Sequence, residues 1–221
     1  MSDHASGAPP ALRATIAAEL RPVRPLRPPL VRGLALVPVA MVLLVAAPLV
    51  FEFRDLAALG WSWSWGASIL QLGAGLALVV AALRESIPGR TWSRAALATL
   101  AAAPVAIVTA IALVSWQRSP IVLAGPALIV GAICLTASAI TALPATCLAV
   151  LLALNAYPTR PAIAGWLAGL GGGLLADAGW RLFCHFSEPS HVLVAHLGGV
   201  LVAGAIGAVG ARTLHRARSG K

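Results

Sequence analysis

Three cysteines are the side chains of this 221-residue chain with the clearest capacity for chemistry. Cys134 opens one apolar run and Cys184 closes the next, so an antiparallel hairpin would bring both thiols to the same level. Neighbouring thiols form a disulfide in an oxidising compartment or bind a soft metal ion. Two buried small hydrophobes are the alternative. Cys147 lies about 20 Å deeper by helical rise, which favours a packing role.

A group of histidines follows Cys184, with an acidic residue among them. Cysteine and histidine suit transition-metal ions, so His185, His191 and His196 are candidate ligands beside Glu188. The spacing matches no regular ligand motif. His191 and His196 are five residues apart, which places them on different faces of an α-helix. A metal site is therefore an open alternative that the spacing does not favour.

Asp177 and Arg181 are ionisable residues of one apolar run, and an intramembrane carboxylate is a functional candidate by default. Their four-residue separation predicts an ion pair along one helix. A proton relay through Asp177 is the alternative. The sequence has no Ser-His-Asp set, no pair of catalytic carboxylates and no HExxH motif, so we expect neither an enzyme nor a cofactor.

The composition indicates that these residues sit in a membrane protein. Hydrophobic residues make up 59% of the chain and charged residues 10%, against about 25% charged in soluble domains. Runs of about 20 apolar residues predict spans, and the six runs are 33–51, 66–83, 95–114, 134–154, 162–183 and 192–211. Residues 121–133 are interpreted as a short interfacial or re-entrant segment, because 121–154 as one helix would measure about 50 Å. We predict an all-α polytopic fold.

Basic residues set the predicted orientation. With six spans and a cytoplasmic N-terminus, only Arg54, Arg118 and Arg181 of the 16 basic residues fall outside, a strong positive-inside bias. Both termini are then cytoplasmic in a bacterial inner membrane, and the charge of +9 sets topology without requiring nucleic acid as a partner. The predicted units are an N-terminal segment 1–32, a transmembrane domain 33–211 and a basic tail 212–221.

Glycines recur in the fifth run at helical spacing, at Gly165, Gly169 and Gly173. Small residues let helix backbones approach closely in a bilayer. We therefore predict tight packing of this span, and no phosphate loop, because no flanking strand or Lys-Ser/Thr accompanies the glycines.

The N-terminal segment predicts a short helix with one apolar face. Leu12, Ile16 and Leu20 are spaced by four, and Pro22 ends the pattern. About three turns of helix are marginal alone in water, so this helix needs a partner. The membrane surface and the groove of another protein are both open.

Several short motifs, in order along almost the whole chain, resemble NrsF-type anti-sigma factors. They are Glu19-Leu20-Arg21-Pro22-Val23-Arg24, Ser86-Ile87-Pro88-Gly89-Arg90, Cys134 ten residues before Pro144, Tyr157-Pro158-Thr159-Arg160-Pro161, and Cys184 after the fifth run. One departure is visible. The family commonly has Cys-Pro-Glu after the fifth span, whereas this chain has Cys184-His185-Phe186.

The resemblance implies a membrane-bound negative regulator of an extracytoplasmic-function (ECF) sigma factor. The expected partners are that sigma factor and the lipid bilayer. It implies a sensing role for Cys134 and Cys184, and binding of the sigma factor by segment 1–32, at Leu12, Ile16, Glu19, Leu20, Arg21, Pro22, Val23 and Arg24. Two other functions stay open. A small transporter or permease subunit would use polar residues such as Gln71 and Asp177, and a thiol- or metal-responsive membrane protein would lack a sigma partner.

Overall fold

The computed structural model describes residues 9–19, 25–122 and 127–220, and all regular elements in these ranges are helical. Six helical stretches there are long and apolar enough to cross a membrane, which confirms the predicted all-α fold with six spans. They are Pro29–Val50, α5 Trp61–Glu85, α6 Arg94–Arg118, α7 Ala127–Leu154, α8 Pro161–Phe183 and Pro189–Ser219.

The first and last spans are composite. The first joins α2 Pro29–Gly33, a 3-10 turn η1 Leu34–Leu36 and α3 Val37–Phe51. The last joins α9 Pro189–His191, a π-helical stretch η2 Val192–Leu197 and α10 Gly198–Ser219.

Local signals explain where several helices begin. Ser93 caps α6, because its hydroxyl accepts a 3.2 Å hydrogen bond from the Ala96 N–H. Asp55 caps the short helix α4 Leu56–Leu59 in the same way, accepting from two backbone N–H groups. Pro161 occupies the first turn of α8, where a missing N–H costs nothing.

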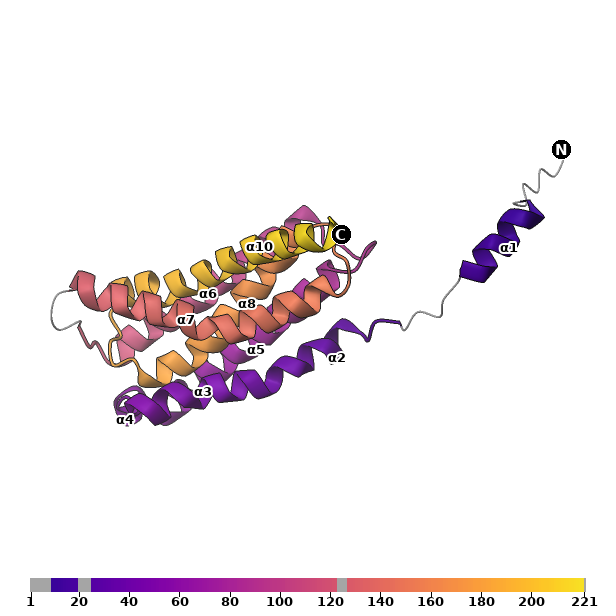
Figure 1. Ribbon diagram of the computed structural model, residues 1–221. Coiled ribbons are helices and arrows are strands. Elements are labelled where there is room, and N and C mark those ends of the chain that lie inside the picture. Colours follow the sequence, from indigo (N-terminus) through magenta and orange to yellow (C-terminus); the bar gives the residue numbers. More distant parts are fainter. Residues whose placement is uncertain (1–8, 20–24, 123–126, 221) are drawn as a thin grey trace.

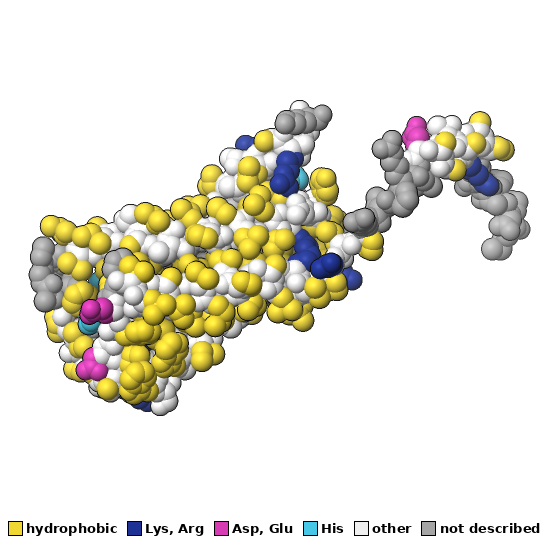
Figure 2. Space-filling model, turned by 60° about the horizontal axis from the view of Figure 1, so that its bottom comes forward, with side chains coloured by type: hydrophobic (Ala, Val, Ile, Leu, Met, Phe, Trp, Pro, Cys, Tyr) yellow, Lys and Arg dark blue, Asp and Glu magenta, His cyan; other side chains and the backbone are white. Residues whose placement is uncertain are grey.

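The spans form one bundle, in which the first span begins at the end where the last span ends. α2 begins and α10 ends at the same end of the bundle (Figure 1). We call this the basic end, defined by Arg84, Arg160 and Arg212, and the opposite end, with Cys134 and Cys184, the thiol end. Figure 2 shows Arg side chains gathered at the basic end and apolar side chains along the flank. The face expected to meet lipid is therefore apolar.

α7 differs from the sequence interpretation. It is one continuous helix from Ala127, so the separate segment predicted for 121–133, with a span beginning at Cys134, is wrong. Residues 127–133 are apolar and contain no proline, and their one glycine, Gly131, is tolerated inside a helix, while Gly125-Pro126 stands directly before the helix. At 28 residues α7 measures about 42 Å, longer than a hydrocarbon core of about 30 Å. Tilting or projection beyond the core accommodates the excess.

α8 is the central helix, and its packing follows from its glycines. It contacts α3, α5, α7 and α10. A Cβ on Gly169 would collide with the backbone of Ala203 and Gly204 in α10, and one on Gly172 would meet Thr146 of α7. This confirms the predicted packing role of the small residues.

The N-terminal segment contains the predicted helix, α1 Pro10–Glu19. None of its residues is buried, and the side chains of Leu12 and Ile16 are about half exposed. The rest of the predicted binding motif, 20–24, lies outside the described residues.

Candidate functional site

The thiol end gathers residues from three spans. Cys184 is the C-cap residue of α8, and its N–H donates a 2.7 Å hydrogen bond to Trp180 O. Cys134 lies near the start of α7, and the loop after Cys184 leads to α9 and η2. The antiparallel arrangement of α7 and α8 thus brings both cysteines to one end of the bundle, as their positions in the sequence suggested.

A local change of helix type aligns the two histidines of the last span. In a π-helix each N–H bonds five residues back, which widens the turn. Residues five apart therefore share a face, and the rings of His191 and His196 lie edge to face with centroids 5.7 Å apart. The expectation that they occupy different faces is wrong, because it assumed an α-helical period throughout.

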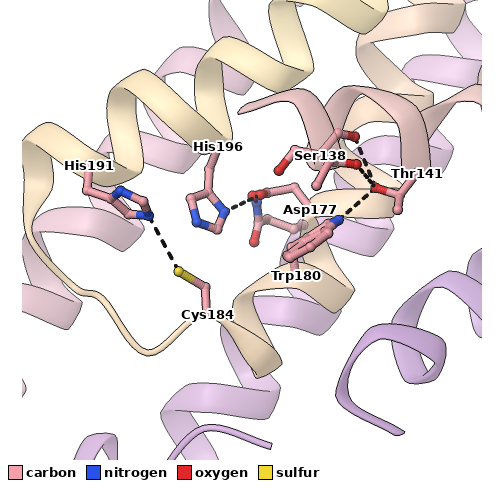
Figure 3. Close-up of polar contacts among 9 residues, drawn as sticks. Ser138, Thr141, Asp177, Trp180, Cys184, His191 and His196 are labelled. Atoms are coloured by element: carbon pink, nitrogen blue, oxygen red, sulfur yellow. Dashed lines mark hydrogen bonds and ion pairs between the residues drawn. The ribbon is translucent and has the colours of Figure 1, made fainter. Parts of the chain in front are cut away.

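One thiol and two imidazoles, those of Cys184, His191 and His196, lie together (Figure 3). Cys184 Sγ lies 3.5 Å from His191 Nε2. One ligand atom each from Cys184, His191 and His196 lies within 4.8 Å of the others, and all three residues are buried. Cys134 lies close enough to Cys184 and His191 to interact with both. We call these four residues the thiol-imidazole cluster.

Asp177 holds His196 at the edge of the cluster. His196 Nδ1 lies 2.6 Å from Asp177 Oδ1, and the Gln71 amide donates a 2.5 Å hydrogen bond to Asp177 Oδ2. The close ion pair of Asp177 is made with His196 across the bundle. Arg181, the predicted partner, interacts with Asp177 electrostatically at longer range. A carboxylate only accepts hydrogen bonds, so His196 Nδ1 is the donor in this contact and Nε2 points away from Asp177.

Two arginines supply positive charge beside the thiols. The Arg54 guanidinium donates a 3.2 Å hydrogen bond to the His185 carbonyl. Burial lowers the pKa of Arg54, while Cys184 acts to raise it. Hydrogen bonding with Cys134, followed by burial, raises the pKa of the Cys184 thiol above its usual range. Arg181 also interacts electrostatically with Cys184. These cations favour thiolate once a proton leaves.

The other candidate residues at this end lie outside the cluster. His185 is exposed, and Glu188 accepts a 2.7 Å hydrogen bond from the Ser190 hydroxyl. Cys147 is exposed on α7 and is not part of the cluster. The arrangement brings one sulfur and two imidazoles within 4.8 Å of one another, a donor set suited to a metal ion, and places the thiol of Cys134 beside them.

A second polar cluster joins the connections at the basic end. Glu85, fully buried, forms a 2.6 Å ion pair with Arg160 and accepts a 2.7 Å hydrogen bond from the Trp92 N–H. Arg160 donates to the Trp92 carbonyl at 3.1 Å, and the Arg84 guanidinium lies 3.8 Å from the centre of the Trp92 indole. We call these four residues the basic-end clasp. It ties together the two connections whose motifs resemble the family.

Sequence reasoning missed two features of this site. The sequence shows Gln71 only as a single amide in an apolar span, and nothing in it marks Gln71 as the partner of Asp177. The sequence does not mark the π-helical stretch either, because histidines spaced five residues apart are not a known motif.

A comparison with protein-family models finds a match over most of the chain. The family model NrsF, negative regulator of sigma F, matches residues 16–216. Searches of the curated proteins and of the solved structures found no match. The family match covers all six spans, the thiol-imidazole cluster and the basic-end clasp. The chain therefore belongs to the NrsF family, the negative regulators of sigma F, and is a helical membrane protein that regulates a sigma factor negatively.

Proposed function

We propose that the chain is an anti-sigma factor of the bacterial inner membrane that sequesters an ECF sigma factor at its cytoplasmic face. Both termini and the basic end are cytoplasmic in this proposal, and the thiol end faces the periplasm. The family match supports the regulatory role. The gathering of Arg side chains at the end where the first span begins and the last span ends supports the orientation.

The observation that carries the proposal is the state of α1. Its apolar residues Leu12 and Ile16 are about half exposed, and no residue of the helix is buried. An amphipathic helix of ten residues gains stability chiefly from burying its apolar face. Docking in a groove of the sigma factor supplies that burial. We assign the docking contacts to Leu12, Ile16 and Glu19, continuing through residues 20–24.

Release is proposed to begin at Cys134 and Cys184. The two thiols lie together at the end of the bundle opposite to α1, so they cannot touch the bound sigma factor. α8 connects the two ends, because it carries Cys184 at its last turn and follows directly on Arg160 of the basic-end clasp. A change at the thiols displaces this helix and, with it, the connections near the docking site.

The experiment is co-expression of the intact protein with individual ECF sigma factors, each read with its own promoter reporter. We expect one sigma factor to be repressed and to co-purify from membranes with the tagged protein. A truncation lacking residues 1–24 should still insert but should neither repress nor co-purify. Equal repression by the truncated and intact proteins would exclude the segment as the docking element.

A further inference from the structure

We propose that Cys134, Cys184, His191 and His196 form a binding site for one thiophilic d10 metal ion, such as Zn²⁺, Cd²⁺ or Cu⁺, and that Asp177 orients His196 within it. The inference deepens the proposed function, and it rests on that function only where binding serves as the signal for release.

The geometry fits a tetrahedral ion. Bond lengths of about 2.3 Å to sulfur and 2.0 Å to nitrogen separate tetrahedral ligands by about 3.5 Å. Cys184 Sγ and His191 Nε2 are 3.5 Å apart, and the cluster atoms of Cys184, His191 and His196 lie within 4.8 Å of one another. Cys134 interacts with Cys184 and His191, but its sulfur lies outside the group of atoms within 4.8 Å of one another. It supplies the fourth ligand by moving toward the other three.

The unpartnered Nε2 of His196 points to a missing ligand. His196 is 2% exposed, and its Nε2 has no hydrogen-bond partner. Buried polar atoms are normally satisfied, so this orphan requires an explanation. In Figure 3 the His196 ring lies between Asp177 and the Cys184–His191 pair. With Nδ1–H donating to Asp177, the Nε2 lone pair is free for a metal.

Asp177 and Gln71 match the outer partners of known metal sites. A ligating histidine usually donates its other N–H to a carboxylate, which fixes the tautomer and the ring orientation. The Asp177 carboxylate does this for His196, and the Gln71 amide fixes the carboxylate in turn. Asp177 is thus a positioning residue rather than a ligand.

Charge and space are compatible with a bound ion. Binding of Zn²⁺ or Cd²⁺ releases one proton from each thiol, so two thiolates and two neutral imidazoles balance the +2 charge. The neighbouring cations Arg54 and Arg181 favour this loss of protons. A cavity of about 10 Å³ beside Cys184 and His196 holds room for roughly one water-sized body.

The two histidines distinguish a metal site from a mechanism in which Cys134 and Cys184 respond only by forming a disulfide. A disulfide between Cys134 and Cys184 requires neither imidazole, whereas the metal site requires both. The test therefore titrates Cd²⁺ into purified, reduced, full-length protein in detergent, and follows thiolate-to-cadmium absorption in the ultraviolet. We expect one ion per chain, with Zn²⁺ and Cu⁺ competing for the same site.

Matched variants define the ligands. His191→Gln and His196→Gln should each weaken Cd²⁺ binding, as should Cys134→Ser and Cys184→Ser, while Asp177→Asn should weaken it about 10- to 100-fold. Cys147→Ser and His215→Gln, which change an exposed thiol and a histidine at the far end of α10, should bind as the wild type does. Wild-type affinity in both histidine variants would overturn the four-ligand site.

A measurement on the unaltered protein guards against misfolded variants. Cd²⁺ should slow alkylation of Cys134 and Cys184 at least tenfold, with no effect on Cys147, as followed by mass spectrometry. Equal alkylation with and without Cd²⁺ would overturn the inference. If the protein represses a sigma factor and responds to oxidants but binds no metal, this inference alone fails. If it binds Cd²⁺ at this site yet represses no sigma factor, the proposed function fails and the metal site stands.

Discussion

The Gln71 amide nitrogen lies 2.5 Å from Asp177 Oδ2, in a part of the bundle where both side chains are almost completely buried. This contact joins α5 to α8, and the second oxygen of the carboxylate continues it to His196 in the last span. Three spans are thus held by one carboxylate, so its partners contribute to the stability of the whole bundle.

Replacing Gln71 with Leu should destabilise the protein by about 1–3 kcal/mol, because a buried carboxylate oxygen loses its donor. The loss at a charged group exceeds the gain from removing the unpartnered amide oxygen of Gln71. Thermal unfolding in detergent measures the effect. Gln117→Leu, at an exposed position of α6, is the matched control and should leave the midpoint unchanged. Equal midpoints for both variants would contradict the prediction.

Gly169→Ala should destabilise the bundle by about 1–3 kcal/mol, because the new methyl group collides with the α10 backbone at Ala203 and Gly204. The control is Gly210→Ala on α10, where an added Cβ meets no atom within 4 Å. The fraction of each variant that stays monodisperse on heating in detergent is the readout. A Gly169→Ala protein as stable as the control would show that α8 and α10 separate at little cost.

Reporter fusions test the orientation. A reporter active only in the cytoplasm should work when fused after Lys221 or after Arg90, but not after Ser190. The prediction rests on the bias of basic residues toward one side. A reporter active only in the periplasm should give the reverse pattern. Cytoplasmic activity at Ser190 would exclude the proposed six-span topology.

If α1 docks through its apolar face, substitutions on that face should abolish repression and substitutions on the opposite face should not. Leu12→Asp with Ile16→Asp should restore sigma-dependent transcription to nearly the level seen without the anti-sigma factor, because the apolar face is lost. Adding Leu20→Asp should complete the effect. Ala14→Asp with Ala18→Asp places the same charge on the opposite face and should leave repression intact. Membrane levels of every variant are measured by immunoblot, and repression unchanged in the first variant would move the docking site elsewhere.

The thiol pair predicts a loss of response without a loss of repression. Cys134→Ser with Cys184→Ser should still repress transcription but should answer poorly to thiol oxidants or soft metals. Cys147→Ser should respond as the wild type does, since this residue lies outside the cluster. Induction curves of the sigma-dependent reporter give the comparison. A normal response in the double variant would reduce both cysteines to packing residues.

The number of spans follows from the sequence because each span must be apolar on its own. The start of α7 did not follow, since residues 127–133 are as apolar as the helix they open, and apolarity alone cannot separate an interfacial segment from an extra turn. The placement of Cys134 beside Cys184 was accessible, because two sequential antiparallel spans fix which residues share a level.

The partners of Asp177 and the alignment of the histidines required the folded chain. Arg181 is the nearest opposite charge in sequence, but Asp177 faces the bundle interior, where Gln71 and His196 arrive from other spans. The shared face of His191 and His196 depends on a π-helical stretch of six residues, which composition does not encode. Contacts between helices, rather than along one helix, build this site.

The burial of α8 has a consequence for how the protein is made. Its mean hydropathy of 1.2 is below the 2.0–2.5 of the other five spans, and it carries both Asp177 and Arg181. Near the middle of a helix such residues each oppose partitioning into lipid by about 3 kcal/mol, and less toward its ends. We expect α8 to leave the translocon poorly by itself and to remain beside it until α10, which supplies its tightest packing surface, emerges from the ribosome. The sixth span would then decide whether the fifth span ever enters the bilayer.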